Sequence, residues 1–320
     1  METSAPENME AENNKSFLTR FYIYQKERFP LLTHGIMIAA FSFSAVSYSR
    51  ICRGKENFIP LNIFLPGVFI TISFFLLLRI LDEFKDAEED AAYRKYLPVP
   101  RGLISLKELK AVGVVTLTLQ LLVQAIFFPK MILLWMIAIV YEGLMGAEFF
   151  VPAWLKKMPM LYVISHMFII PLVDIYASGL DWFLENTFAP AGLIFFLAVS
   201  YMNGIVVEFG RKIRPAFAEE EGVVTYTKLY GENRATLYWV IALTITLALS
   251  IAASVFAGYG LLAYTILFVL FILCCAPALL FIKNKTRKNA KMIEYASGVW
   301  TITMYLTLGG VPMLKNLFAI

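Results

Sequence analysis

The chain has 320 residues, of which 59% are hydrophobic and 16% are charged, and its net charge is +4. This composition excludes an ordinary soluble domain, in which about a quarter of the residues are charged. It does not indicate a nucleic-acid-binding protein either, because the basic residues follow the ends of apolar segments and form no stripe.

Nine apolar segments reach or approach the roughly 20 residues that a helix needs to cross a bilayer. They cover residues 32–49, 60–80, 111–128, 131–150, 159–179, 188–207, 235–256, 260–282 and 297–317. The first and the last are the weakest, because Ser, Thr and Gly dilute them. We therefore predict an all-α, polytopic membrane protein, with nine transmembrane helices arranged as a bundle around a central cavity.

Residues 1–30 are polar and lack the apolar core of a cleaved signal peptide. We predict a cytoplasmic N-terminal segment over residues 1–30, in which Met1 to Ser16 are disordered. The transmembrane domain is expected to follow over residues 31–320.

The basic residues indicate how the bundle is oriented. With nine spans, the loops on the side of the N-terminus contain 23 Lys and Arg residues, whereas the other side contains five. Lys and Arg are enriched in cytoplasmic loops. We therefore expect an integral membrane protein whose N-terminal side, with any site on it, faces the cytoplasm.

The end of the second span carries an acidic motif in the sequence LDEFKDAEED, residues 81–90. Asp82, Asp86 and Asp90 are four residues apart, so in a continuous helix they stack on one face and repel each other. A bound Mg²⁺ would explain this arrangement, because Mg²⁺ is usually held by one or two carboxylates and by substrate phosphates. An acidic, solvated helix end is the simpler alternative.

The loop after this motif is basic. Arg94, Lys95 and Arg101 are expected close to the carboxylates, and Pro98 and Pro100 predict an extended, stiff segment. Ser105 is a suitable N-cap for the next helix, with Glu108 completing a capping box. Carboxylates beside basic side chains suit a metal–diphosphate complex, which needs both signs of charge.

Several ionisable residues lie inside predicted spans, among them Glu142, His166 and Asp174. Intramembrane ionisable groups suggest a functional site, although hydrogen bonds between helices explain many of them. An ion pathway through these three residues would be typical of a secondary transporter.

A second charged cluster follows the sixth span. Glu208 and Lys212 are four residues apart, Arg211 and Arg214 add positive charge, and an acidic run covers residues 219–221. A surface ion pair with basic anchors is the simpler interpretation. However, carboxylates and bases again meet at a helix end on the N-terminal side.

These motifs resemble those of the UbiA superfamily of intramembrane prenyltransferases. Members typically carry Asn-Asp-x-x-Asp-x-x-x-Asp after the second of nine helices, and residues 82–90 are similar, with Asp82 in the Asn position and Glu83 in the first Asp position. LPVPRGLIS at residues 97–105 is similar to the family's Arg-Pro-Leu-Pro-x-Gly-x-Ile-Ser, with Leu97 in place of Arg. GVVTY at residues 222–226 is similar to the end of the family's second motif. That motif usually contains Asp-x-x-x-Asp, whereas this chain has Glu208 and Lys212.

The resemblance implies a reaction on a prenyl diphosphate, with a hydrophobic or aromatic acceptor and with Mg²⁺ as cofactor. The implied metal ligands are Asp82, Glu83, Asp86 and Asp90, and the implied catalytic residues are Asp82, Asp86, Asp90 and Lys212. The implied diphosphate-binding residues are Arg94, Lys95, Arg101, Arg211 and Glu208. Tyr141, Tyr162, Tyr201 and Phe209 are candidates to stabilise an allylic cation.

Three functions therefore stay open on the sequence. The first is transfer of a prenyl group to an acceptor, and the second is cyclisation of a prenyl diphosphate without an acceptor, which the superfamily also includes. The third is transport, which would place polar residues near the midplane in broken helices. Because the densest charge lies at helix ends, we favour prenyl transfer.

Overall fold

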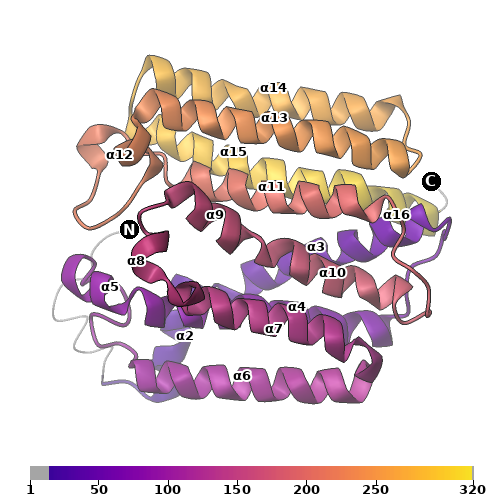
Figure 1. The fold of residues 1–320 in the computed structure, drawn as a ribbon, viewed down its shortest axis with the longest axis horizontal. Coiled ribbons are helices and arrows are strands. Elements are labelled where there is room, and N and C mark those ends of the chain that lie inside the picture. Colours follow the sequence, from indigo (N-terminus) through magenta and orange to yellow (C-terminus); the bar gives the residue numbers. More distant parts are fainter. Residues whose placement is uncertain (1–13, 319–320) are drawn as a thin grey trace.

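The computed structural model describes residues 14–318, and this part of the chain is helical without strands (Figure 1). The α-helices follow in chain order. They are α2 Phe17–Arg28, α3 Leu31–Cys52, α4 Leu61–Lys85, α5 Ala87–Tyr93, α6 Leu106–Phe127, α7 Ile132–Gly146, α8 Pro152–Leu155, α9 Pro159–Met167, α10 Ile169–Trp182, α11 Leu193–Arg211, α12 Tyr226–Tyr230, α13 Glu232–Phe256, α14 Leu261–Lys283, α15 Arg287–Tyr305 and α16 Val311–Phe318.

Short 3₁₀ turns occur at Pro129–Met131, Glu148–Phe150 and Ala216–Ala218, and a π-helical turn occurs at Leu306–Gly310.

Eight segments of the described chain are long and apolar enough to cross a membrane, which confirms a polytopic membrane protein. The ninth expected span corresponds to α15, the π-helical turn and α16, which follow one another without a break. Its first half is too polar to count by composition alone. Figure 1 nevertheless shows α15 alongside α11, α13 and α14.

Local sequence explains most helix boundaries. The predicted capping box is present, because Ser105 Oγ accepts from the Glu108 amide at 3.2 Å and Glu108 accepts from the Ser105 amide at 2.8 Å. The expected span 159–179 is divided into α9 and α10 at Phe168. The expected span 188–207 begins only at Leu193, after a non-helical segment that contains Pro190.

The loop between α5 and α6 differs from its prediction. It is not extended but folds into consecutive turns, in which the Arg101 amide donates to the Leu97 carbonyl and the Leu103 amide to the Pro98 carbonyl. Gly102, with a φ of 80°, supplies the left-handed residue that these turns require. Of the predicted N-terminal segment, residues 1–13 lie outside the described residues, and Phe17–Arg28 forms α2.

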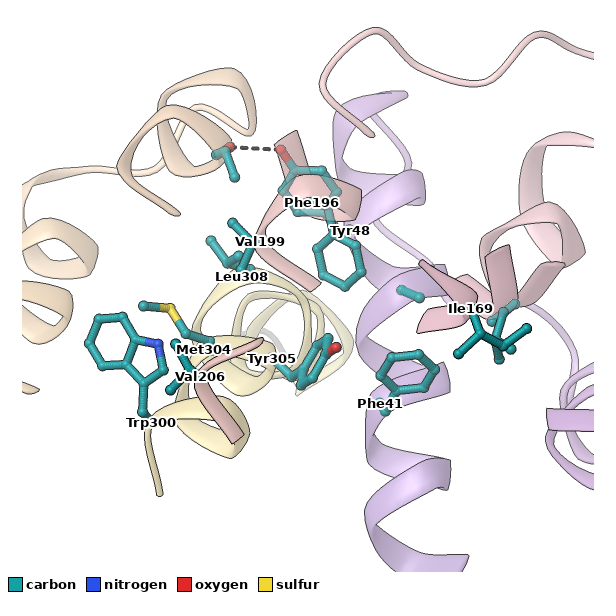
Figure 2. Close-up of a cluster of buried hydrophobic side chains, with 14 of the residues drawn as sticks. Phe41, Tyr48, Ile169, Phe196, Val199, Val206, Trp300, Met304, Tyr305 and Leu308 are labelled. Carbon is teal, nitrogen blue, oxygen red and sulfur yellow. Dashed lines mark hydrogen bonds between the residues drawn. The ribbon is translucent and has the colours of Figure 1, made fainter. Parts of the chain in front are cut away.

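The core lies where α3, α10, α11 and α15 pack together. Figure 2 shows Phe41, Phe196 and Tyr305 gathered at this point, with ring centroids 4.9 Å apart for Phe41–Tyr305 and 5.8 Å apart for Phe196–Tyr305. The π-helical turn approaches α3 so closely that a Cβ on Gly309 would lie 2.1 Å from the Ser44 carbonyl oxygen. Only glycine fits there.

Because the spans alternate in direction, one end of the bundle collects the ends of α4, α7, α11 and α14. The same end holds α5, α8 and α12 (Figure 1). We call it the motif end. At the opposite end, Arg50 and Arg53 both donate to the fully buried Asp181, at 2.8 and 2.7 Å, and so join α3 to α10.

Candidate functional site

The first motif spans the junction between α4 and α5. α4 ends at Lys85, Asp86 has φ and ψ of −93° and 3°, and α5 begins at Ala87. The Asp86 amide still donates to the Asp82 carbonyl at 2.9 Å, and the Asp90 amide to the Asp86 carbonyl at 2.8 Å. The three aspartates therefore stay on successive turns, although the helix is bent at the middle one.

Each aspartate has a different environment. Asp82 accepts from Lys85 Nζ at 2.8 Å, and Asp90, which is 2% exposed, pairs with Arg94 at 2.7 Å. Asp86 forms no ion pair with any residue that the structure describes. Burial raises the pKa of the Asp86 carboxyl, and the negative charge of Asp82 acts in the same direction, against Lys85.

Glu83 is buried and bonded to two arginines. Its side chain is 1% exposed and accepts from Arg28 Nε at 2.7 Å and from Arg79 Nη2 at 3.0 Å. Arg28 belongs to α2, so this carboxylate fastens the N-terminal helix to α4. Glu83 is thus already neutralised by two guanidinium groups.

The second cluster forms at the end of α11. Glu208 is 5% exposed and accepts from Arg211 at 2.6 Å and from Lys212 at 2.8 Å. The Lys212 ammonium lies 5.7 Å from the centre of the Tyr226 ring, which stacks on Phe209 at 4.0 Å. The cluster therefore combines two cations with an aromatic wall.

The loop after this cluster closes onto the first motif. Gly222 has a φ of 72°, and a Cβ there would lie 2.2 Å from the ring of Tyr93 in α5. Glu220 pairs with Arg214 at 2.8 Å, while Glu219 accepts from the hydroxyls of Thr225 and Thr227. The acidic run therefore shapes the loop.

An aromatic stack lies beside the first motif. Tyr162 and His166 of α9 stack with their centroids 3.8 Å apart, and the Lys85 ammonium lies 5.8 Å from the centre of the Tyr162 ring. His166 Nδ1 lies 2.9 Å from the Tyr162 carbonyl oxygen, whereas its buried Nε2 has no partner among the described residues. Tyr141, another predicted aromatic, donates to the Ser165 carbonyl, and Tyr201 donates to that of Ile164.

A left-handed turn at the end of α7 supports this stack. Glu148, Phe149 and Phe150 have φ of 47°, 53° and 60°, a conformation that costs roughly 1–2 kcal/mol per residue. The turn places Phe149 against His166, with centroids 5.9 Å apart, and buries Glu148 within electrostatic reach of Tyr162. No pattern in the sequence predicts such strain, which is typical of functional sites.

The two charged clusters lie close enough to interact at the motif end. Arg211 lies within electrostatic reach of Asp82, and His166 within reach of both Asp82 and Glu208. The side chains of Asp82 and Arg211 are 36% and 57% exposed, so both are open to water. We call the two clusters together the charged site.

One of the predicted diphosphate-binding residues, Arg101, is bonded to the N-terminal helix. Arg101 forms a two-pronged ion pair with Glu27 of α2, at 2.8 and 2.7 Å, and also donates to the Tyr96 carbonyl. Lys95 is exposed. The sequence missed Lys85 and Tyr226, although the position of Lys85, three residues after Asp82, could have suggested that the two side chains pair.

The residues that suggested an ion pathway do not form a continuous one. Asp174 is fully buried and accepts from Ser200, whose hydroxyl also bonds the Tyr305 hydroxyl at 2.5 Å. Glu142 is buried on α7, and both its carboxylate oxygens lack a hydrogen-bond partner among the described residues. These contacts join α10, α11 and α15, as interhelix hydrogen bonds do.

No group of three His, Cys, Asp or Glu side chains in the described chain could hold a metal ion. Asp82 and Asp86 nevertheless fit one Mg²⁺, because a pair of carboxylates suffices when substrate phosphates complete the coordination. Glu83 and Glu208 fit less well, since each is already bonded to two cationic side chains.

Comparisons with known proteins identify the family and a similar fold. Residues 40–298 match the UbiA prenyltransferase family. A solved structure of a digeranylgeranylglyceryl phosphate synthase has a similar fold, with a TM-score of 0.64 over 92% of this chain and 99% of that one. The sequences are 14% identical, so the likeness concerns the fold. No curated protein matches the chain.

Proposed function

Because the chain belongs to the UbiA prenyltransferase family, we propose that it is an Mg²⁺-dependent enzyme that ionises a prenyl diphosphate and transfers the prenyl group to a hydrophobic or aromatic acceptor. The observation that supports this most is that the two charged clusters interact at the motif end, where Arg211 lies within electrostatic reach of Asp82. We further propose that the charged site faces the cytoplasm, as the 23 basic residues on that side indicate.

In the proposed reaction, the bond between the allylic carbon and the diphosphate oxygen breaks, and the diphosphate leaves with the electron pair. The acceptor then forms a bond to the allylic carbon and loses a proton. Charge therefore develops in two places, on the leaving diphosphate and on the allylic carbon. Preorganised charges near each place lower the barrier.

The roles of the residues follow from their positions. Asp82 and Asp86 would hold Mg²⁺, which neutralises charge on the leaving diphosphate. Arg94, Arg211 and Lys212 would bind the diphosphate. Asp90 would orient Arg94, and Glu208 would orient Arg211 and Lys212. Lys95 follows Arg94 in the sequence, and its exposed side chain would have to turn inward to reach the charged site.

The ring of Tyr162 is a candidate to stabilise the allylic cation. It already holds one cation, the Lys85 ammonium, 5.8 Å from its centre. Cation–π contacts of this kind contribute about 0.5–2 kcal/mol. Phe209 is stacked on Tyr226 and offers a second aromatic surface beside Lys212.

The experiment incubates the purified protein in lipid nanodiscs with Mg²⁺ and prenyl diphosphates of several chain lengths, with and without hydroxylated aromatic and lipid acceptors. Acceptor-dependent release of diphosphate and a prenylated product are expected. Release of diphosphate with a cyclic hydrocarbon and no acceptor would instead establish a cyclase. No consumption of any prenyl diphosphate would contradict the proposal.

A further inference from the structure

The charged site contains more positively charged side chains than its acidic motifs suggest. Asp82 is paired with Lys85, and Glu208 with Arg211 and Lys212. The cations in the second cluster follow an acidic residue at the end of a helix, where basic side chains are common. Lys85 is different, because it lies inside the acidic motif itself.

The side chain of Lys85 turns into the protein. It is 12% exposed, and its ammonium lies 2.8 Å from Asp82 Oδ1 and 5.8 Å from the centre of the Tyr162 ring. It is also within electrostatic reach of Asp86 and His166. An ordinary surface lysine three residues from an aspartate would keep its ammonium in water. Here the ammonium lies between the metal-binding candidates and the aromatic stack.

An ammonium in this position has the chemistry needed to bind a phosphate. It carries three N–H donors and no acceptor, so it can bond Asp82 and an anionic oxygen at the same time. It is a compact point charge, like a small metal ion, and Lys binds phosphate in this way in other proteins. The surrounding ring face excludes water on one side, which strengthens the interaction with an anion.

We propose that Lys85 binds the diphosphate directly and supplies part of the neutralising charge that does not depend on a divalent cation. The proposal rests on the proposed function, because it assigns a further residue to the same substrate. It accounts for a second motif in which Lys212 stands in place of a carboxylate and Arg211 adds a further positive charge. In this proposal four side-chain cations, Arg94, Lys85, Arg211 and Lys212, and the Mg²⁺ held by Asp82 and Asp86 together neutralise the charge of the diphosphate.

The test measures binding of inorganic pyrophosphate to the purified protein by isothermal titration calorimetry, in EDTA and again in Mg²⁺. Wild type is expected to bind pyrophosphate in EDTA. Lys85→Met should weaken this binding about ten- to a hundredfold, the effect of losing one charge-assisted hydrogen bond. Lys85→Arg should retain part of it. The matched control is Lys107→Met, which removes an exposed lysine at the start of α6.

A second variant separates direct binding from positioning of Asp82. Lys85→Met/Asp82→Asn is compared with Asp82→Asn alone, so that the carboxylate that pairs with Lys85, and its repulsion of the anion, are absent from both proteins. A purely structural role for Lys85 predicts that the double variant recovers the pyrophosphate binding of Asp82→Asn in EDTA. Direct contact predicts that binding stays weak. Each variant is first checked for a monodisperse elution profile and a wild-type melting transition. Where Lys85→Met alone unfolds, the double variant carries the test.

Two results with the variants would overturn the proposal. One is wild-type affinity of Lys85→Met for pyrophosphate in EDTA, and the other is recovery of binding in the double variant. Binding by wild type only in Mg²⁺ would also overturn it, while leaving the proposed function intact. Failure to bind or consume any prenyl diphosphate in Mg²⁺ would contradict the proposed function itself.

Discussion

Arg28 of α2 donates a hydrogen bond of 2.7 Å to the buried carboxylate of Glu83 in the first motif. Glu83 stands where the family has its first Asp, so this contact uses a motif position to hold the N-terminal helix. Arg101 of the following loop binds Glu27 of the same helix, and Arg20 binds Glu108 of α6. Three ion pairs therefore hold α2 against the motif end.

This relationship predicts that Glu83 acts mainly on stability. Glu83→Ala leaves Arg28 and Arg79, whose side chains are 16% and 20% exposed, without their acceptor. We expect a loss of about 1–3 kcal/mol in the free energy of unfolding, because partly buried charges lose a charge-assisted bond. Thermal unfolding in detergent measures it. An unchanged melting transition with a raised Mg²⁺ requirement would show that Glu83 is a metal ligand instead.

Asp86 should show the opposite balance between stability and activity. Burial and the charge of Asp82 raise its pKa, so its ionised form is disfavoured in the folded protein. Stability then falls as the pH rises through the window between the unfolded and the raised pKa. We expect Asp86→Asn to abolish diphosphate turnover and to leave stability at pH 7 equal to or slightly above that of wild type.

The measurements for Asp86→Asn are turnover and the melting temperature at pH 7 and near pH 4. The stability difference from wild type should shrink at the lower pH, where the unfolded state also binds part of the proton that the folded state holds on Asp86. A control is Glu88→Gln, which removes an exposed carboxylate from α5. Loss of folding in Asp86→Asn would indicate a structural role.

Lys212 gives a test of the second cluster. Its ammonium is 2.8 Å from Glu208 and faces the Tyr226 ring, and we expect it to contact the diphosphate. Lys212→Ala should lower kcat/KM about ten- to a hundredfold, and Lys212→Asp should lower it further by placing a negative charge beside the phosphates. Steady-state kinetics of both variants measure this. Near wild-type values for Lys212→Asp would return the residue to a role as a topology anchor.

The orientation in the membrane can be tested separately. Reporter fusions after Lys110 and Lys291 should both report the cytoplasm, and one after Lys130 should report the other side. The reason is the distribution of 23 basic residues against five. A non-cytoplasmic signal after Lys110 would place the acidic motif on the wrong face for cytoplasmic substrates.

Features that depend only on neighbouring residues, such as spans and helix caps, could be predicted from the sequence. In a bilayer every backbone group must be bonded within its own helix, so apolar length alone predicts spans. The eight spans, the capping box at Ser105 and the motif at the end of α4 followed from this local information. Helix ends were less well predicted, as at Leu193 and Phe168, where proline and tertiary packing decide.

The ion pairs between distant parts of the chain could not be predicted from the sequence, because they depend on how the helices pack. Nothing near Glu83 in the sequence selects Arg28, and Arg101 binds Glu27 although it follows the acidic motif. Asp82 and Arg211 are more than a hundred residues apart in the sequence. They interact because α4 and α11 end on the same side of one bundle. Such pairings depend on how helices pack, because charges interact strongly only where packing brings them together and removes water from between them.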